Sequence, residues 1–463
     1  MTTSKDIPIV RGGLPFLGHA LPFMKAPIPF LKKGYKEHGN IFSMKLPGQN
    51  VVVMLGPEHN SFFFGETDKL LSVRGAYPFF QRMFNKEFFA NAKFEDYKMQ
   101  RDIILPCFKA TVMPNYIDIM VLETFAFMDK LGENGTFDLT KEFGHLVMNI
   151  ASHSFFGKDF KEKLGDSVFD DFRDFAKAID PVLPGWLPIP KFKKSKKAKQ
   201  KLAKNVISLI QDRRKNPISP PDFLQTLLES KNKDGSPVSD ILLKDLIVLL
   251  VWAGHETTNG HISWALIHLL QNQEYLQSVI KEQQEVFGSA PKFTMNEAKK
   301  LKRIEWAIKE TERMHPVILA IIRKAKDSFE HDGFIIPKGS MVYLSPSVSH
   351  KLPDVFSNPE QYDPLRFSKG KQIKNSLIGF GGGMHRCTGI NFAYLEMKVV
   401  LTLLLQHYDF ELLNSKPKPV KGIQMKWPES PCMIRYSKKK NAPKLSKAEF
   451  MKTELEQVCP YQR

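Results

Sequence analysis

The longest pattern of apolar positions in the chain lies between Ser239 and Gln271. Within it, Leu246–Ala253 is apolar on every helical face, which predicts a helix that runs through the core rather than along the surface. Such a helix would be roughly 50 Å long at a rise of 1.5 Å per residue. Either Ser239 or Asp240 can cap its first turn. Charged residues inside the segment, Lys244 among them, argue against a membrane span.

Shorter patterns on either side predict further helices and small sheets. Ile41–Leu46 and Val51–Leu55 are strand-like, and the Pro-Gly-Gln-Asn between them predicts a hairpin. Residues 93–215 show helical periodicity interrupted by loops, and a late helix is expected from Asn391 to about His407. The remaining expected elements are a helix at Phe30–His38, a helix that ends within Lys309–Pro316, and strands at Phe334–Gly339, Met341–Ser345, Asp409–Leu413 and Cys432–Tyr436. The predicted fold class is therefore mainly α with small β-sheets.

We expect these elements to form one large domain over residues 1–436. Residues 1–30 are rich in proline and glycine, and from residue 7 onward they predict an extended segment that lies on the core. Residues 437–463 read as a basic tail with at most one short helix. The composition, with 42% hydrophobic and 25% charged residues, is normal for a globular protein with a large core.

The chain carries a formal net charge of +18, which admits nucleic acid, an anionic membrane or an acidic protein as a partner. No nucleic-acid motif with interleaved aromatic residues occurs, so no nucleic-acid partner is expected. An apolar, proline-rich loop at residues 181–190 is followed at once by a run of lysines. Residues 181–197 therefore fit a peripheral contact with an anionic bilayer. They fit equally well a stiff helix connector with a solvated lysine face.

The four cysteines provide no disulfide framework and no C-x-x-C metal pair in a chain of this length. They indicate a reducing compartment, so the expected location is cytoplasmic, with membrane contact only at the periphery. The N-terminus lacks a basic stretch followed by an apolar one, and no run of about 18 apolar residues occurs. We therefore expect no transmembrane segment.

The segment Phe380–Gly389 concentrates unusual chemistry in a few residues. It places Cys387 in a loop with four glycines and two basic residues, directly ahead of a helical pattern. A helix N-terminus and nearby cations favour thiolate over thiol, and glycines let the backbone approach a flat cofactor closely. Thiolate is the ligand that pushes electron density onto haem iron. A buried structural cysteine after a glycine turn remains an alternative from the loop alone.

Two other kinds of site are excluded by spacing. A phosphate-binding loop fails because neither G-x-G-x-x-G nor G-x-x-x-x-G-K-[ST] can be written across residues 379–389. A zinc-binding helix fails because the histidine that follows His255-Glu256 is His261, and positions i and i+6 lie on opposite faces of a helix. Two candidate roles for Cys387 therefore remain, a haem ligand and a structural cysteine.

Three further signatures precede the loop. They are Ala-Gly-His-Glu-Thr at 253–257, Glu-x-x-Arg at 310–313 and Asp-Pro-x-Arg-Phe at 363–367. The first places an acid beside an alcohol in an apolar helix, which is costly unless something uses them. The second can form an ion pair on one helix face, although such a pair by itself is usually an ordinary surface pair. In this order, with Phe-x-x-Gly-x-His-x-Cys-x-Gly at 380–389, the signatures resemble those of the cytochrome P450 superfamily.

Within that superfamily the chain is most similar to the sterol 14α-demethylase family. The likeness covers the general layout of residues 8–437 and local sequences such as Ala76–Phe79 and Arg323–Glu330. The departures from that family are Glu256 in place of a usual histidine, Gly379 in place of a frequent proline, Met384 in place of a frequent basic residue, and Arg82 and Asn85 in the region where a proline and a glycine are expected.

The resemblance implies a cytochrome P450 fold, in which a long central helix crosses one face of a haem and the cysteine loop lies on the other. It implies a haem-thiolate monooxygenase that uses O₂ and two electrons to hydroxylate or oxidatively demethylate a lipophilic substrate such as a sterol. The implied cofactor is haem b, with Cys387 as the iron ligand and Phe380 as a shield for the sulfur. The residues implied to hold the haem propionates are Tyr77, Lys98, Arg323 and His385.

The resemblance also assigns roles around the haem. Glu256 and Thr257 are expected to pass protons toward the O₂ site. The residues expected to brace the cysteine loop as a charge network are Glu310, Arg313 and Arg366. The residues expected to line the substrate pocket are Tyr77, Phe79, Phe84, Ala253 and Ile321.

Electrons are expected from NAD(P)H through a separate reductase. The basic charge suits an acidic redox partner (a ferredoxin, a flavodoxin-like protein or a flavin reductase) that docks near the cysteine loop. Two alternatives stay open on the same fold, a peroxide-using or isomerase relative and a non-catalytic haem-binding sensor. The intact pair of Glu256 and Thr257 favours O₂ activation over the first of them.

Overall fold

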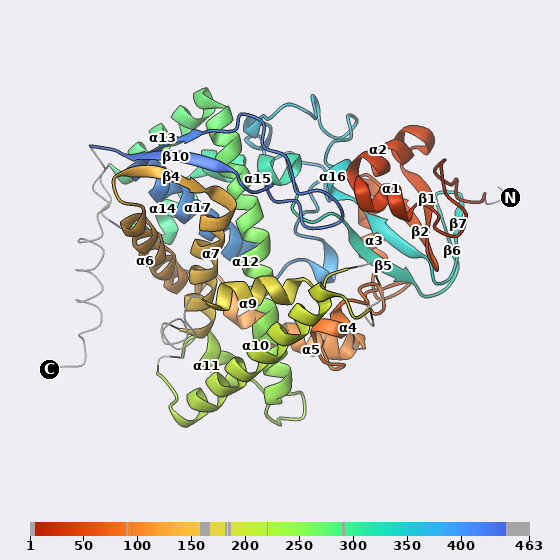
Figure 1. Cartoon of the computed structure of the whole chain (residues 1–463), viewed down its shortest axis with the longest axis horizontal. Coiled ribbons are helices and arrows are strands. Elements are labelled where there is room, and N and C mark those ends of the chain that lie inside the picture. Colours follow the sequence, from red (N-terminus) through yellow and green to blue (C-terminus); the bar gives the residue numbers. More distant parts are fainter. Residues whose placement is uncertain are drawn as a thin grey trace.

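Helix α12 (Asp240–Gln271) crosses the centre of the molecule and organises the fold (Figure 1). Every position from 242 to 270 is buried except Ala253, Gly254 and Thr257. A helix that is apolar on every face avoids water only in the interior, where other elements cover it on all sides. The sequence-based prediction of a buried central helix is confirmed, and its predicted bounds differ by one residue at the N-terminus.

The structure describes residues 5–88, 91, 93–157, 167–180, 183, 187–219, 221–288 and 292–440. The helices that pack against α12 are α7 (Leu139–Phe156), α10 (Pro190–Lys215), α13 (Gln273–Phe287), α15 (Lys302–Met314) and α17 (Ile390–His407). The other helices are α1 (Ala20–Lys25), α2 (Pro27–His38), α3 (Pro57–Glu66), α4 (Phe80–Met83), α5 (Phe94–Ile104), α6 (Met113–Leu131), α9 (Ser167–Ala176), α11 (Phe223–Leu228), α14 (Met295–Lys300) and α16 (Pro346–Ser349). Short 3-10 turns occur at η1 (Leu105–Phe108), η2 (Pro364–Phe367) and η3 (Gly383–His385).

The strands form small sheets at two ends of the helical body (Figure 1). One sheet has the order β1-β2-β8-β5-β3 and lies with the N-terminal elements. Its strands are β1 (Ile41–Leu46), β2 (Gln49–Met54), β3 (Leu71–Ser72), β5 (Ile321–Ala325) and β8 (Met341–Leu344). A second sheet has the order β4-β10-β9, and its strands are β4 (Asn134–Asp138), β9 (Tyr408–Leu412) and β10 (Met433–Lys438). A hairpin joins β6 (Phe329–His331) to β7 (Phe334–Ile336).

The predicted hairpin is confirmed, since β1 and β2 pair antiparallel and Leu46 faces Gln49 across the turn. The fold class, mainly helical with small sheets, is also confirmed. Four strands, β3, β4, β5 and β6, were not predicted. Of these, β4 lies inside the stretch 93–215 that was predicted to be helical. It pairs with β10, about 300 residues further along the chain, and such a distant partner leaves no local signal.

Two predicted boundaries need correction. The segment at residues 1–30 is not extended throughout, because α1 and the start of α2 are helical. Pro27 stands at the beginning of α2, where a proline has no helical hydrogen bond to lose. The domain also extends beyond 436, since β10 continues to Lys438 and the backbone N–H of Lys439 donates to His407 at 2.8 Å. The predicted tail at 441–463 lies outside the described residues.

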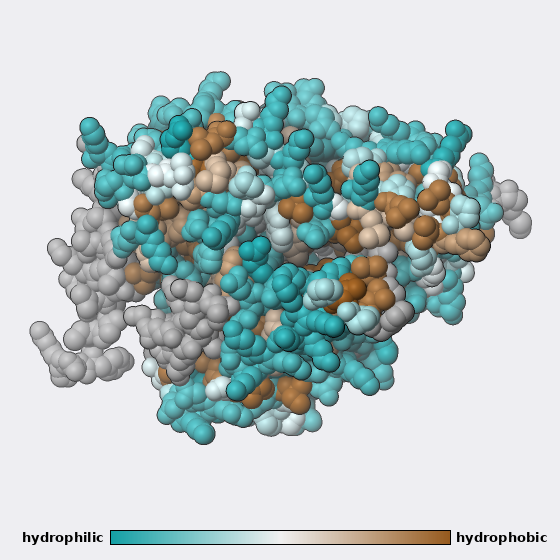
Figure 2. Space-filling view, viewed as in Figure 1, coloured by the Kyte–Doolittle hydropathy of each residue, from teal (hydrophilic) through white to brown (hydrophobic). Residues whose placement is uncertain are grey.

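The surface over α10 is polar (Figure 2), whereas the opposite face of this helix is buried. Figure 2 shows hydrophilic side chains over α10, whose buried face includes Phe192 and Leu202 while Lys193 and Lys196 are exposed. This is the solvated lysine face that the sequence offered as one alternative. Of the predicted membrane segment, residues 181, 182 and 184–186 lie outside the described residues. No helix in the described part of the chain has the length and apolarity that crossing a bilayer requires.

Candidate active site

The cysteine loop is a tight turn that closes on its own backbone. The N–H of Cys387 donates to the carbonyl of Phe380 at 2.9 Å, and the N–H of Gly381 donates to Ile378 at 2.9 Å. A Cβ at Gly382 would overlap the ring of Phe64 on α3, so glycine is required at this position. The loop then leads into α17, which begins at Ile390. The predicted helix behind the cysteine is confirmed.

The loop lies against the central helix. The ring of Phe380 lies 6.0 Å from the ring of His261 on α12 and 5.5 Å from the ring of Tyr394 on α17. His261 is one helical turn after Thr257, so the loop begins beside the partly exposed part of α12. Phe380 is therefore placed close to Cys387 and between two helices, as its predicted shielding role requires.

Cys387 is accessible and yet poorly hydrated. Its side chain is exposed, whereas burial by the surrounding protein raises its pKa. The N–H of Gly389 and the guanidiniums of Arg101 and Arg386 oppose that rise only in part. Together these observations place the sulfur in a recess. The prediction that an electropositive setting at a helix N-terminus favours thiolate is wrong for the net pKa of Cys387, because the cost of desolvation is larger.

Beneath the loop, a buried charge network joins α15 to the turn η2. Glu310 and Arg313 are completely buried, and the Arg313 Nε and Nη2 atoms each donate to the Glu310 carboxylate at 2.8 Å. The Arg366 Nε donates to the same carboxylate at 3.1 Å. Arg313 also donates to the carbonyls of His350 at 3.1 Å and Pro359 at 2.7 Å. The structure thus brings the predicted network together and excludes a surface pair.

The start of the cysteine loop has two further anchors that the sequence analysis missed. The N–H of Gly379 donates to Glu312 Oε1 at 2.9 Å, and the hydroxyl of Tyr394 donates to Glu312 Oε2 at 3.1 Å. The N–H of Ile378 lies 2.9 Å from the ring nitrogen Nε2 of His350. Glu312 lies between the two residues of the Glu-x-x-Arg signature, at a position that the signature leaves open.

On the other side of the loop, α5 supplies a second group of missed residues. The ring of Tyr97 stacks on His385 with centroids 4.1 Å apart, and Arg101 donates to the carbonyl of Arg386 at 3.1 Å. Tyr97 and Arg101 are one turn apart on α5, which the sequence could have shown as an i, i+4 pair. His385 Nε2 lies 2.6 Å from the Asp68 carboxylate, so this nitrogen is engaged.

Of the four residues predicted to hold the propionates, Tyr77, Arg323 and His385 lie near one another, whereas Lys98 has no hydrogen bond or ion pair with them among the described residues. Arg323 is 4% exposed, and within the described residues its Nε atom has no hydrogen-bond partner and the guanidinium no ion pair. The hydroxyl of Tyr77 accepts the N–H of Ile322, the neighbour of Arg323, at 2.9 Å. Burial lowers the pKa of the His385 imidazole, and the nearby Arg323 guanidinium lowers it further, while Asp68 opposes the shift. Lys98 is exposed on α5 and has no partner in the described part of the chain.

The face of α12 that is not fully buried carries the predicted relay. Thr257 donates to the carbonyl of Ala253 at 2.6 Å, and both are partly exposed. Glu256 is 4% exposed, and burial raises its pKa to about 7, with Arg173 on α9 opposing the rise. An acid with that pKa can hold or release a proton near neutrality. No hydrogen bond directly joins the Glu256 and Thr257 side chains among the described residues.

The predicted pocket residues do not form a single group. Phe79 and Phe84 belong to an aromatic cluster around α4, in which Phe84 stacks on Phe88 with centroids 4.0 Å apart and contacts Phe175 on α9 at 5.7 Å. Ile321 packs instead in the core of the N-terminal sheet. Of the five predicted residues, only Tyr77 and Ala253 keep partial exposure. Phe84, at 2% exposed, is a core residue here.

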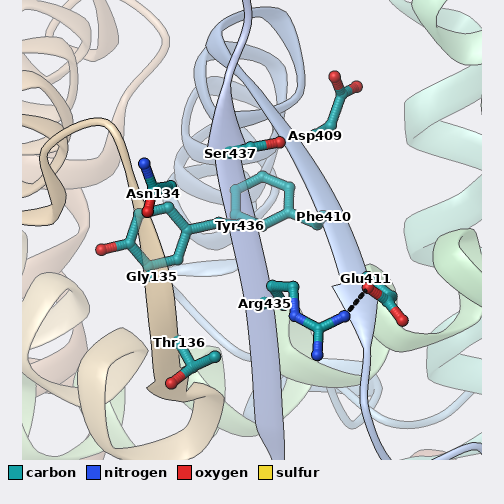
Figure 3. Close-up of a pocket in the computed structure, with 9 residues that line it drawn as sticks. All are labelled: Asn134, Gly135, Thr136, Asp409, Phe410, Glu411, Arg435, Tyr436 and Ser437. Atoms are coloured by element: carbon teal, nitrogen blue, oxygen red, sulfur yellow. Dashed lines mark hydrogen bonds and ion pairs between the residues drawn. The ribbon is translucent and has the colours of Figure 1, made fainter.

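Arg82 and Asn85, two of the departures noted in the sequence, tie the α4 segment to its neighbours. Arg82 Nη2 donates to the carbonyls of Ala178 and Asp180, each at 2.9 Å. The N–H of Asn85 donates to Asp245 on α12 at 2.8 Å. These contacts hold the aromatic cluster against α9 and α12. A surface recess elsewhere, between β4, β9 and β10, has no part in this site (Figure 3).

These groups fit a haem. The fit depends on an accessible sulfur in a recess, a partly exposed face of α12 beside the same loop, and a buried guanidinium that has no anionic partner among the described residues. A metal ion deprotonates a coordinating thiol and would offset the raised pKa of Cys387, and the propionates of a haem would supply an anionic partner for the buried Arg323 guanidinium. Cys387 as a purely structural cysteine would explain neither the accessible sulfur nor the guanidinium.

Comparison with known proteins gives the same class. The sequence profile of cytochrome P450 matches residues 8–435. The chain is 30% identical over 449 residues to an obtusifoliol 14-alpha demethylase of Sorghum bicolor, which covers 94% of this chain and 91% of that protein. It is 30% identical over 447 residues to a lanosterol 14-alpha demethylase of Bos taurus, which covers 95% of this chain and 89% of that protein.

A solved structure has the same architecture. Retinoic acid bound cyanobacterial CYP120A1 superposes with a TM-score of 0.85 at 26% sequence identity, and the match covers 94% of this chain and 100% of that one. The chain belongs to the cytochrome P450 family. Its cofactor is accordingly a haem with a thiolate ligand, and its activity class is that of a monooxygenase acting on a small molecule with a redox partner.

Proposed function

We propose that this P450 hydroxylates or oxidatively demethylates a lipophilic substrate of the sterol class. The observation that carries the proposal is the partly exposed face at Ala253, Gly254 and Thr257 in an otherwise buried helix, beside the cysteine loop. Tyr77 and Ala253, both partly exposed, pack against the same apolar core cluster as the phenylalanines around α4. Apolar and aromatic surfaces favour a rigid, water-insoluble ligand. The sterol 14-alpha demethylases to which the chain is similar favour sterols among such ligands.

In this proposal Cys387 is the iron ligand, and Arg323, Tyr77 and His385 would hold the propionates. The Nε atom of Arg323, which has no partner among the described residues, supports this assignment. Lys98, which is exposed on α5, is the fourth candidate for this role. The chemistry that haem supplies when bound is reductive activation of O₂ for insertion into a substrate C–H bond. Glu310, Arg313 and Arg366 keep the cysteine loop in place.

Thr257 and Glu256 are the proposed proton donors to the O₂ site. Thr257 is accessible on the open face, and its hydroxyl is held by the Ala253 carbonyl. Glu256 stores a proton close to neutral pH because it is buried. Since no direct bond joins the two, water would carry the proton between them.

The proposed electron source is NAD(P)H, through an acidic ferredoxin, flavodoxin-like protein or flavin reductase. The surface near the cysteine loop supports this choice, because Lys98, Arg386 and Lys109 are exposed there on α5, the loop itself and the segment after η1. Basic side chains attract an acidic partner and speed its association at low salt. We also propose that residues 181–197 contact an anionic bilayer at its surface. The exposed lysines of α10 support this contact.

The substrate class can be tested by titrating 14α-methyl sterols and long-chain fatty acids into the ferric protein. Sterols should produce the low-to-high-spin change in the Soret band. The variant Ala253→Phe should weaken that response about tenfold, because the added ring fills the space over the open face of α12. A response to fatty acids alone, with no response to sterols, would remove the sterol class. Turnover with peroxide but not with reductase and NAD(P)H would favour the peroxide-using alternative, and no product under either condition would favour a haem-binding sensor.

A further inference from the structure

We propose that Glu312 is a positioning residue for the thiolate loop, and that it acts together with Gly379 as a matched pair. Its carboxylate fixes the backbone at the start of the loop and thereby the orientation of Cys387. The inference rests on the haem-thiolate function proposed above. It adds a residue outside the Glu310, Arg313 and Arg366 network.

The Glu312 carboxylate has one bond to each side of the loop. Oε1 accepts the N–H of Gly379, before the cysteine, at 2.9 Å, and Oε2 accepts the hydroxyl of Tyr394, after the cysteine, at 3.1 Å. Tyr394 is on α17, the helix that follows the loop. The buried side chain of Glu312 on α15 therefore connects the backbone segment that precedes the cysteine loop with α17, the helix that follows it.

The connection reaches Cys387 in two steps. Gly379 is bonded covalently to Phe380, whose carbonyl accepts the N–H of Cys387 at 2.9 Å. The Phe380 ring packs 5.5 Å from the ring of Tyr394, the second partner of Glu312. One carboxylate thus holds both Gly379 and Tyr394. A shift of Gly379 would move Phe380 and, through its carbonyl, the backbone of Cys387. The effect of Glu312 on the sulfur is thus mechanical and needs no direct contact.

Gly379 and Glu312 require each other. A Cβ at position 379 would lie 2.8 Å from both Cγ and Oε1 of Glu312, so a larger residue there would displace the carboxylate from its present position. A proline at 379 would also lack the N–H that Glu312 accepts. Conversely, an apolar side chain at 312 would leave the buried N–H of Gly379 without a partner, which is costly.

Glu312 is not explained by ordinary stabilisation of the helix. It is 5% exposed, and burial raises its pKa to about 7. The bonds from Tyr394 and Gly379 and the charges of Arg386 and Lys309 oppose the rise. A buried carboxyl that must be desolvated would be a poor choice for packing alone. Its hydrogen bonds to the loop give a reason for its presence.

The test measures the stability of thiolate ligation in the full-length holoenzyme. The readout is the rate at which the red-shifted Soret band of the ferrous–CO complex is lost in mild denaturant. Glu312→Leu and Gly379→Pro should each lose that band at least about tenfold faster than the unmodified protein, since each removes a hydrogen bond to a charged group. Tyr394→Phe keeps the bond between the Gly379 N–H and the Glu312 carboxylate, which fixes the start of the loop, and should lie between. Glu312→Gln should stay within about threefold of the unmodified rate, because its amide can still accept from Gly379 and can donate to Tyr394.

Glu282→Leu is the matched control. Like Glu312, Glu282 is a carboxylate that accepts backbone N–H groups. Its donors are Lys302 at 3.1 Å and Arg303 at 2.8 Å, at the N-terminal end of α15, whereas Glu312 is near the C-terminal end. The inference requires that this variant keep the band as the unmodified protein does. It is overturned if Glu312→Leu, Gly379→Pro and Tyr394→Phe all match the unmodified rate, or if Glu282→Leu loses the band equally fast. A red-shifted band that is absent from the unmodified protein would instead overturn the haem-thiolate function itself.

Discussion

Glu310→Ala should lower the free energy of unfolding by about 3–5 kcal/mol and should leave the protein unable to retain haem. The reason is that the substitution leaves Arg313 buried at 0% exposure without its carboxylate and removes the bond to Arg366. The turn η2 and the cysteine loop would then lose their common support. Denaturant unfolding measures the first effect, and the ratio of Soret to protein absorbance after purification measures the second.

Glu411→Ala is the control for this experiment. Glu411 pairs with Arg435 at 2.6 Å on the β9–β10 sheet, but the two side chains are 61% and 58% exposed. An exposed pair contributes less than about 1 kcal/mol, so this variant should bind haem normally. If Glu310→Ala and Glu411→Ala unfolded alike and both retained haem, the buried network could not be a support for the loop.

Thr257→Ala and Glu256→Gln should separate electron use from product formation. Reductant would still be consumed, while the yield of oxidised product per reductant should fall, on the order of 100-fold, because the proton donor is lost. The measurement compares NAD(P)H consumed with product formed. Thr258→Ala is the control, since Thr258 is the next residue on α12 but is buried, at 3% exposed. Unchanged yields in both Thr257→Ala and Glu256→Gln would remove the relay.

The pH dependence of the yield gives an independent check on Glu256. Its pKa is raised to about 7, so the carboxyl is mostly protonated below that pH and mostly ionised above it. A donor must be protonated to act, and the yield should therefore fall as the pH rises through about 7. Glutamine does not titrate, so Glu256→Gln should give a low yield with no such transition. A transition that persists in Glu256→Gln would belong to another group.

The elements that local pattern determines were predictable from the sequence. The apolar run of α12, the hairpin of β1 and β2 and the helix after Cys387 follow from hydrophobic periodicity and turn residues. Strand β4 was not predictable in this way, because its pairing partner is about 300 residues away. Periodicity also could not show that the Glu310 and Arg313 pair is completely buried.

The candidate site divides in the same way. Residues inside a recognisable signature, such as Cys387 and Thr257, were found from the sequence. Glu312 and Arg101 were missed, because each looks like an ordinary polar residue on a helix and acquires its role only when the cysteine loop packs beside it. The pKa of Cys387 was predicted in the wrong direction, since the neighbouring charges are visible in the sequence but the extent of burial is not.

The most direct test of Cys387 as the haem ligand is the ferrous–CO spectrum of the purified protein beside that of Cys387→Ser. A thiolate ligand gives the strongly red-shifted Soret band, and we expect this band in the unmodified protein and its complete loss in Cys387→Ser. Cys107→Ser is the control, because Cys107 is a buried thiol whose pKa is raised by burial to about 12, and this variant should keep the band. A red-shifted band that survives in Cys387→Ser would show that another residue holds the iron.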